Sequence, residues 1–414
     1  MQTMTTSHSK LIWTEPPVSP LGSITQSIDN SETLVLNMPT SKLALNIASV
    51  PQRHDNNNPL WQGPCGKGPL GGITQSMIVR FLSCRERFRL RYILGLDLYG
   101  KWNHRIGYGN MWHICEQFHA GQEEYETPLL CHTQELIRKY RTQEADIVKW
   151  YNVCLVQFPE YAKYWKEHPD VKNRTPLMRE SVFDVGYILP SGRMVRLRGK
   201  FDSVDLITDK VTGPDGGIYL QENKTKGDID KLQVERQLKF DLQTMLYLIA
   251  LERVACIDYG SEAPILGVRY NVIRRPLSGG VGNIRPHKGK ATRSTITQAE
   301  TDEEFYERLR HDYIADDPAY WFFRVRSEVS KKDIQVFKDT CFDPLLETIC
   351  WWYEQVTNAR TRRIDDAPPP MNYRTPFGVY SSLEEGGATE YDAYLETGSE
   401  AGLQRVETMF PELQ

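Results

Sequence analysis

Four strand-like segments in the middle of the chain constrain its fold more than any other feature. Residues 179–189 and 193–207 alternate apolar and polar side chains around Pro-Ser-Gly, which is a hairpin turn signal. A third strand-like segment, 217–225, is followed by a helical segment with one apolar side at 228–254 and by another strand-like segment at 264–275. This order of elements predicts an α/β protein with a central mixed β-sheet flanked by helices.

Helical patterns lie on both sides of this centre. Residues 133–168 and 331–356 predict helices, and Ser76 can cap a helix that begins there. After Ser76, apolar residues recur at helical spacing, namely Met77, Phe81, Cys84, Phe88 and Tyr92. Five arginines occupy the remainder of that helix, which makes it either a solvated face or a surface that contacts phosphates.

Composition divides the chain into three regions. Residues 1–68 are rich in Ser, Thr, Asn and Pro, which predicts a largely disordered leader. Residues 69–363 form the predicted domain. Residues 364–414 carry ten Asp or Glu and two Arg, so this acidic tail has a net charge of −8 within a chain of net charge −4. The remaining residues therefore have a net charge of +4, and a nucleic-acid partner stays open for them.

The eight cysteines include no Cys-x-x-Cys pair, which is typical of scattered, reduced thiols. No stretch approaches the ~20 continuous apolar residues of a membrane span. A secretory signal pattern is also lacking at the N-terminus. We therefore expect a cytoplasmic protein that does not engage a membrane.

The chemistry of the chain is indicated by the end of the third strand. Because side chains alternate along a strand, Ile218, Leu220, Glu222 and Lys224 share one face. Asp202 lies in the preceding strand and can converge on Glu222 if the two strands pair. Two adjacent carboxylates repel one another unless a divalent cation lies between them, and oxygen ligands suit Mg²⁺ or Mn²⁺.

A metal beside an amine indicates phosphodiester hydrolysis, with Lys224 orienting the attacking water. Gln243 and Tyr247 lie one helical turn apart and could contact substrate or only cap a helix–sheet contact. Glu222 and Lys224 could alternatively form a surface ion pair. Asp205 is an alternative to Asp202, although the spacing from Gly199 favours Asp202.

The ordered set of Asp202, Glu222-Asn-Lys224 and Gln243-x-x-x-Tyr247 resembles the PD-(D/E)XK nuclease superfamily, in its RecB-like branch of phage-type exonucleases. The match covers about residues 73–255. The segment "GNMWH" resembles the upstream histidine motif of that branch, and Glu180 resembles an acidic residue that often precedes the Asp strand. The segment "TQSMIVRFLSCRERFRLRYILGL" resembles its N-terminal helix.

The resemblance implies a restriction-endonuclease-like core and a Mg²⁺- or Mn²⁺-dependent deoxyribonuclease, with an exonuclease of DNA recombination or repair as the leading expectation. It implies a metal site of His113, Asp202 and Glu222, catalysis by Asp202, Glu222 and Lys224, and an auxiliary role for Glu180. For a phage-encoded protein, the location is the host cytoplasm. Cys84 matches the early cysteine of an iron–sulfur pattern, but Cys341 and Cys350 do not form its late pair, so we expect no cluster.

A basic, Gly-rich loop follows the fourth strand, with Arg274, Arg275, Lys288 and Lys290 as candidate substrate contacts. This loop could instead be a solvated one. Two further functions remain open: a DNA-binding or recombination-assembly protein that has lost catalysis, and an interaction protein that works through its acidic tail. Exonuclease or endonuclease action, strand polarity, RNA as a substrate, oligomeric state and protein partners are not decided by the sequence.

Overall fold

A computed structural model describes residues 53–166, 168, 172–210, 212–213, 216–227, 229–238, 241–258, 264–276, 284–286, 293–295, 301–314, 317–358, 388–410 and 413. The chain divides into two compact units, Met1–Val50 and Pro51–Gln414, and every described residue belongs to the second unit. Lys288 and Lys290 lie outside the described residues.

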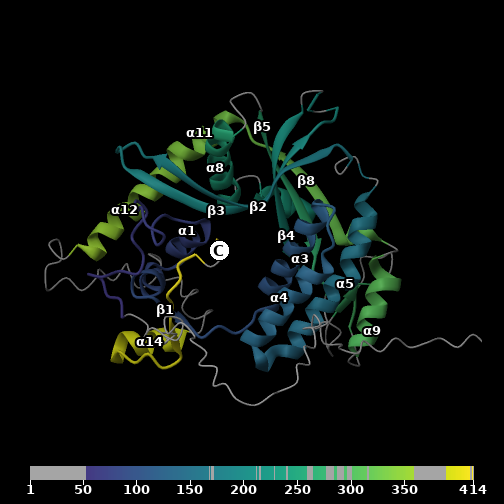
Figure 1. Ribbon diagram of the computed structural model, residues 1–414, viewed down its shortest axis with the longest axis horizontal. Helices are drawn as coiled ribbons and strands as arrows, with labels where there is room; N and C mark the ends of the chain where they lie inside the picture. The colour runs from purple at the N-terminus through teal and green to yellow at the C-terminus, as the bar shows by residue number, and fades with distance from the viewer. Residues whose placement is uncertain are drawn as a thin grey trace, which may run out of the picture. The chain divides into compact units, whose positions relative to one another are not determined.

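A five-stranded sheet of order β2-β3-β4-β5-β8 forms the centre of this unit (Figure 1). Its strands are β2 (Arg174–Ile188), β3 (Met194–Ile207), β4 (Gly217–Lys226), β5 (Ile265–Arg274) and β8 (Phe322–Glu328). The β4–β5 pair is parallel and the other three pairs are antiparallel. The predicted mixed sheet is therefore confirmed, and the parallel pair requires the helical crossover between β4 and β5.

The predicted Pro-Ser-Gly hairpin joins β2 to β3. The Leu189 N–H donates to the Arg193 carbonyl at 2.8 Å, which closes the loop. Gly192 has a φ of 83°, a left-handed conformation that favours glycine. This turn fixes the register of the two long strands that carry the acidic residues described below.

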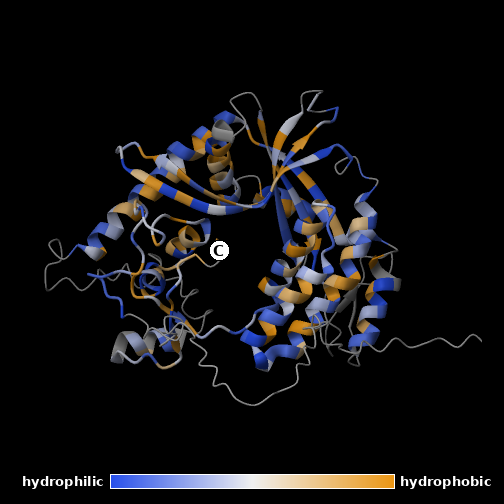
Figure 2. Ribbon diagram, viewed as in Figure 1, coloured by the Kyte–Doolittle hydropathy of each residue, from blue (hydrophilic) through white to orange (hydrophobic). Residues whose placement is uncertain are grey.

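One side of the sheet is covered by α8 (Leu242–Asp258), which contacts β2, β3, β4 and β5. The helix is apolar around most of its circumference, as Figure 2 shows, because residues 245–251 are all buried in the larger core cluster. The same cluster includes residues of α1 (Gln75–Ser83), α11 (Lys331–Phe337) and α12 (Asp343–Thr357). This packing holds the start of α8 against the sheet.

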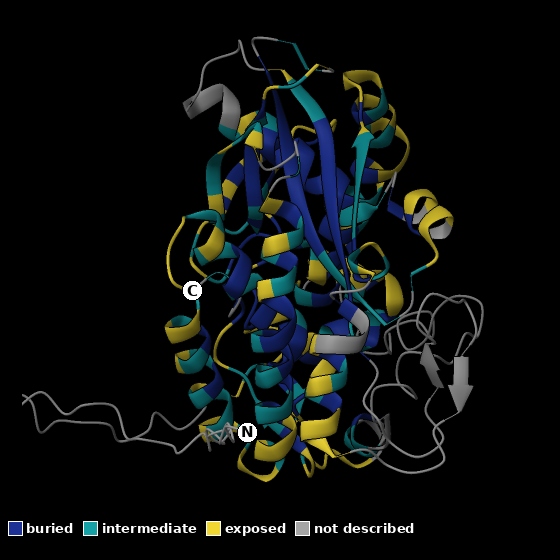
Figure 3. Ribbon diagram, turned by 90° about the vertical axis from the view of Figure 1, so that its right-hand side faces the viewer, coloured by how far each residue is buried: buried dark blue, intermediate teal, exposed yellow. Residues whose placement is uncertain are grey.

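A second cluster of buried side chains forms among a group of helices beside the sheet. Its main elements are α3 (His104–Ala120), α4 (Glu126–Lys139), α5 (Glu144–Lys166) and α9 (Asp302–Glu307). Helix α3 contacts β2, β3 and β4, so it runs beside the acidic strands. The central strands β4 and β5 are largely buried, whereas the edge strands β2 and β8 are only partly so (Figure 3).

The remaining described elements are short. They are α2 (Arg85–Phe88), η2 (Arg89–Ile93), β1 (Leu96–Leu98), η3 (Arg141–Gln143), α7 (Lys231–Leu238), β6 (Ile284–Pro286), β7 (Arg293–Thr295), η4 (Arg308–Ile314), α10 (Pro318–Trp321), η5 (Lys338–Phe342), α14 (Ala388–Thr397) and β9 (Leu403–Arg405). Among the described helices, none combines the length and apolar composition that crossing a membrane requires.

Two predicted helices are interrupted. The segment 228–254 forms α7 and α8, and Asp241 accepts a hydrogen bond from the Thr244 N–H at 3.3 Å, as a residue that caps a new helix does. The segment 133–168 includes parts of α4 and α5, which the short η3 separates.

Parts of the predicted leader and tail pack against the domain. Trp61 is fully buried, and its indole N–H donates to the Gly72 carbonyl at 2.7 Å. Strand β9 pairs with β1, and the Tyr391 hydroxyl of α14 donates to Asp97 at 3.2 Å. Residues 1–52 and 359–387 lie outside the described residues, so the assignment of 1–68 as leader and 364–414 as tail remains a prediction there.

Candidate active site

Three carboxylates form a row across the first three strands of the sheet. The residues on either side of Glu180 pair with those on either side of Asp202, which places these two side chains opposite one another. Ser203 pairs with Gln221 in the next strand, so one step further along the register brings Asp202 opposite Glu222. Antiparallel pairing therefore converts three distant positions in the sequence into neighbours.

The strands are irregular where this row crosses them. Glu180 has a φ of 43°, a left-handed conformation that is uncommon for a residue with a side chain. In β3, Phe201 and Val204 both pack into the larger core cluster, although strict alternation would turn them to opposite faces. Backbone strain of this kind costs ~1–3 kcal/mol and clusters at functional sites.

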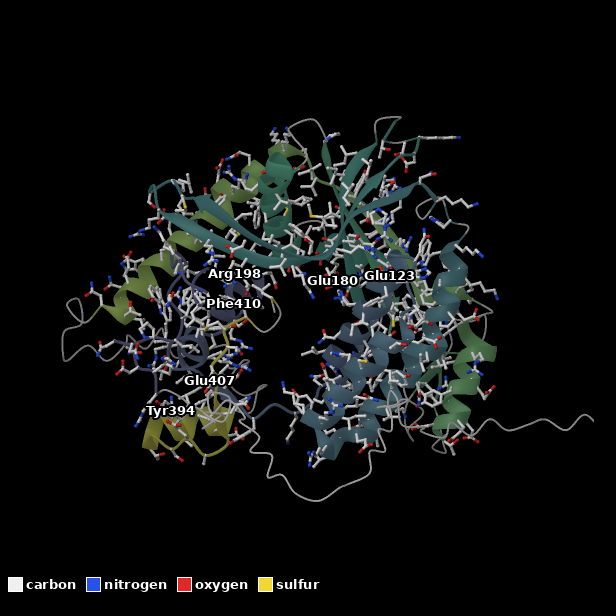
Figure 4. All side chains as sticks on the ribbon, in the orientation of Figure 1. Glu123, Glu180, Arg198, Tyr394, Glu407 and Phe410 are labelled. Atoms are coloured by element: carbon white, nitrogen blue, oxygen red, sulfur yellow. The ribbon has the colours of Figure 1, made fainter. Side chains whose placement is uncertain are left out.

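His113 reaches the row from α3. Its Nδ1 lies 3.3 Å from Glu180 Oε1 and 3.5 Å from Asp202 Oδ1. One ligand atom from each of these three residues lies within 4.8 Å of the others, close enough to hold one metal ion. Figure 4 labels Glu180 where the sheet faces α3 and α4. Glu180, which was predicted to be auxiliary, thus lies in the same group as His113 and Asp202.

Glu222 adjoins this group but is held by different partners. Its Oε2 accepts hydrogen bonds from Lys224 Nζ at 3.2 Å and from Gln243 Nε2 at 2.8 Å, and Lys224 Nζ also donates to Gln243 Oε1 at 2.7 Å. Glu222 Oε1 is buried, and no described residue donates a hydrogen bond to it. A buried carboxylate oxygen without a donor is a free acceptor for a cation.

Electrostatics at the row favour the arrival of positive charge. Burial, together with the nearby Asp202 carboxylate, raises the pKa of Glu222 to about 8. Burial also raises the pKa of Asp202. Burial disfavours a charged His113, yet the Asp202 and Glu180 carboxylates outweigh it and raise the pKa of His113 to about 9. A divalent cation would relieve this repulsion and could replace the proton on His113.

The donor set fits a divalent metal. One imidazole nitrogen and several carboxylate oxygens are ligands that Mn²⁺ accepts, and oxygen ligands suit Mg²⁺. The second Asp202 oxygen accepts the Asn223 N–H at 2.8 Å, which fixes the orientation of the carboxylate. The other Glu180 oxygen is bound by Lys200 Nζ at 2.6 Å. These contacts leave one oxygen of each carboxylate directed at His113.

Tyr247 lies beside the row in a position fixed by a glycine. The tyrosine ring contacts Phe183 and Phe201 edge-on, with centroids 5.3 and 5.8 Å away. A Cβ added at Gly199 would lie 2.5 Å from the Phe183 ring and 3.2 Å from the Tyr247 ring, so only glycine fits there. Gln243 and Tyr247 therefore both face the carboxylates from α8, as their spacing predicts.

A cavity of about 780 Å³ opens in front of the His113 group. It is bounded by the start of α1, by α3, by α4 and by the acidic strands. The residues that line it are Thr74, Gln75, Ser76, Asn110, His113, Ile114, Gln117, His132, Glu135, Glu180, Gly199, Lys200, Asp202 and Tyr247. The cavity is large enough for part of a nucleic-acid strand to approach the carboxylates.

Asp205, the alternative to Asp202, belongs to a different buried cluster. It is fully buried and forms ion pairs at 2.8 Å with Arg174 and with Arg269. Ser203 donates a further hydrogen bond to it at 2.8 Å. Asp205 is thus compensated internally and lies apart from His113, which leaves Asp202 as the aspartate of the site.

The basic residues after β5 are only partly described. Arg274 is mostly buried, and its guanidinium lies 3.9 Å from the centre of the Tyr320 ring. Arg275 is more exposed and lies near Arg105 at the start of α3. Partial burial lowers the pKa of Arg275, and the positive charge of Arg105 lowers it further. The structure does not place Arg274 with the carboxylates.

A network of buried polar side chains lies behind the row and has no counterpart in the sequence-based expectations. The Asn271 amide nitrogen, which has two hydrogens to donate, lies within hydrogen-bond distance of three oxygens: that of Asn223 at 2.9 Å, the Tyr161 hydroxyl at 2.7 Å and Glu116 at 3.1 Å. Arg324 donates to the Tyr161 hydroxyl at 2.8 Å. The network ends at Asn223, whose backbone N–H holds Asp202, so it supports the orientation of a candidate metal ligand.

Comparison with known proteins identifies the family. The model of the PD-(D/E)XK nuclease superfamily matches residues 73–328, which is more than half of the chain and includes His113, Glu180, Asp202, Glu222 and Lys224. No curated protein sequence matches the chain significantly. The chain belongs to the PD-(D/E)XK nuclease superfamily, whose members are nucleases that use divalent metals, and its mixed sheet is the core of that fold.

Proposed function

We propose that this protein is a Mg²⁺- or Mn²⁺-dependent deoxyribonuclease of the RecB-like branch, acting as an exonuclease in phage or host DNA recombination, repair or processing. The observation that carries the proposal is the meeting of Glu180, Asp202 and Glu222 in one row, with His113 and Lys224 beside them. Burying several carboxylates together costs desolvation free energy, which a bound cation would offset.

Each residue of the row has a role in this proposal. His113, Asp202 and Glu222 hold the metal, and Glu180 adds a further ligand from the opposite strand. The bound metal would supply Lewis-acid activation of the scissile phosphate and lower the pKa of a water molecule. Lys224 orients the attacking water and balances the charge that develops on the phosphate.

Gln243 positions Lys224 and Glu222 relative to one another. It accepts from the amine at 2.7 Å and donates to the carboxylate at 2.8 Å, so both side chains keep one geometry. Tyr247 borders the cavity from the same helix and offers an aromatic edge and a hydroxyl to substrate. Arg275, just after β5, and Lys288 and Lys290 are proposed to offer basic contacts to the DNA backbone.

The test is DNA hydrolysis by the purified protein and by Lys224→Ala. We expect linear duplex DNA to be degraded from its ends with Mg²⁺ or Mn²⁺, and closed circular DNA to remain intact. Removing the amine should reduce the rate by about 10²–10³-fold. Lys331→Ala, an exposed lysine on α11, is the matched control and should retain full activity.

Three results would overturn parts of the proposal. Equal activity of the wild type and Lys224→Ala would remove the amine from the mechanism. Cleavage of closed circles would make the protein an endonuclease. Tight DNA binding without product in any divalent metal would instead support the catalytically silent DNA-binding protein.

A further inference from the structure

Two cysteines that lie far apart in the sequence are in contact in the structure. Cys65 precedes the first described helix, and Cys350 lies on α12. Their Sγ atoms lie 3.9 Å apart, which is a contact between two thiols and not a bond. Cys65 is exposed, whereas Cys350 is buried. One thiol of the pair can therefore meet a reagent from solvent while the other is already in contact with it from the protein side.

The backbone around Cys65 is held in place. The Gly66 N–H donates to the Gly63 carbonyl at 3.1 Å, which closes a turn with Cys65 at its third position. The Pro64 carbonyl accepts the Arg196 N–H at 2.9 Å, and this bond ties the turn to β3. The closeness of the two thiols is thus set by the fold, which gives them a high effective concentration toward one another.

Helix α12 holds the same segment from the other side. Tyr353, almost one turn along the helix from Cys350, donates its hydroxyl to the Trp61 carbonyl at 3.1 Å. The rings of Tyr353 and Trp61 also meet edge-on, with centroids 5.1 Å apart. Because an S–S bond is about 2.05 Å long, the two Cys side chains need to approach by only roughly 2 Å.

The surroundings of Cys65 favour the thiolate, which is the reactive form of a cysteine. The hydrogen bond from the Cys350 thiol and the positive charge of Arg193 lower the pKa of Cys65 to about 7, against the effects of partial burial, Glu354 and Glu347. The same hydrogen bond raises the pKa of Cys350. Cys65 is therefore suited to attack a reagent first, and Cys350 is suited to react second.

We propose that Cys65 and Cys350 form an oxidation site, which closes to an intramolecular disulfide in the presence of a small disulfide such as oxidised glutathione. The Cys65 thiolate attacks one sulfur of glutathione disulfide, forms a mixed disulfide and releases one glutathione thiolate. Cys350 then gives up its proton, attacks Cys65 Sγ and releases the second glutathione. Two protein thiols are oxidised to one disulfide, and the oxidant is reduced to two thiols that take up the two protons.

The disulfide ties the segment before α1 to α12. That segment continues into residues 74–76, which line the cavity at the candidate active site. Oxidation therefore anchors one wall of this cavity to the rest of the domain. Disulfides of cytoplasmic proteins are usually transient, so the site suits a reversible response. The inference rests on the packing of this segment and not on the proposed nuclease function.

Peptide mapping by mass spectrometry tests the pairing directly. The folded full-length protein is treated with oxidised glutathione, its remaining thiols are blocked, and it is digested without reduction. We expect a cross-linked peptide that contains Cys65 and Cys350, and a higher unfolding temperature than in the reduced protein. Dithiothreitol should reverse both. A stable glutathione adduct on Cys65 without the cross-link, or no reaction at Cys65, would overturn the proposal.

Variants separate the two roles. Cys350→Ser should retain a glutathione adduct on Cys65, whereas Cys65→Ser should form neither the adduct nor the cross-link, and oxidation should raise the unfolding temperature of neither variant. Cys131→Ser, which removes an exposed cysteine on α4, is the matched control and should behave as the wild type. If oxidation stabilises Cys65→Ser as much as the wild type, the effect arises elsewhere and the proposal is wrong, whether or not the protein is a nuclease.

Discussion

Two aspartates three residues apart on β3, Asp205 fully buried and Asp202 mostly so, have opposite environments. Asp205 is surrounded by Arg174, Arg269 and Ser203, so its charge is neutralised within the fold. Asp202 lies beside the Glu180 and Glu222 carboxylates, with only the His113 imidazole 3.5 Å away and no arginine among the described residues paired with it, and burial raises its pKa. Burial of an acid therefore does not by itself mark a function; an acid grouped with other acids, whose charge the fold compensates only in part, does.

The largest expected effect comes from removing the charge of Asp202. Asp202→Asn keeps the shape of the side chain but removes a charge that a metal needs, so we expect nuclease activity to fall by at least about 10²-fold. The measurement is the initial rate of DNA degradation in Mn²⁺. Stability should not fall, because the substitution reduces repulsion within the row. Near-normal activity would mean that Asp202 is not a ligand.

The matched substitution at the ion-paired aspartate is Asp205→Asn. It leaves two buried guanidinium groups without their carboxylate, so we expect the free energy of unfolding to decrease by about 3–5 kcal/mol. Denaturant unfolding measures this. A variant that is fully stable but inactive would move the functional role from Asp202 to Asp205.

Adding a divalent metal tests the role of Asp202 through the stability of the wild-type protein. An ion that binds only the folded state should stabilise it, by about 2.7 kcal/mol at one hundred times its dissociation constant. Thermal unfolding with and without Mn²⁺ should show this shift in the wild type and not in Asp202→Asn. Chelation with EDTA should reverse it. An equal shift in both proteins would place the ion at another site.

The remaining prediction concerns how the stability of the metal-free protein depends on pH. The folded-state pKa values of Glu222, about 8, and His113, about 9, lie above their ordinary values. The folded state therefore binds more protons than the unfolded chain, and stability should fall as pH rises from about 5 to 9. In Glu222→Gln this decline should be shallower. A stability that rises with pH over this range in the wild type would contradict the arrangement of charges.

The sequence predicted what depends on local patterns. The alternation in 217–225 places Glu222 and Lys224 on one face, and Gly192 marks the hairpin that aligns β2 with β3. The family resemblance supplied His113 and Glu180, which are remote in sequence but adjacent in the structure. The mixed sheet and the superfamily were therefore accessible before any coordinates.

Other features depend on geometry that periodicity does not encode. The left-handed backbone at Glu180 and the broken alternation after Phe201 bring Glu180 beside His113. Lys200 has no sequence signal for its ion pair with Glu180. The role of Asn271 also has no sequence signal. It becomes visible only when its hydrogen-bond partners on α3 and α5, Glu116 and Tyr161, are in place.

The most direct test of the central claim is a crystal structure of the protein with Mn²⁺, read from the anomalous scattering of the ion. We expect one strong peak bonded to His113 and Asp202, with Glu180 and Glu222 on either side and Lys224 nearby. A peak bound elsewhere, or no peak while these side chains point to separate regions of solvent, would contradict it.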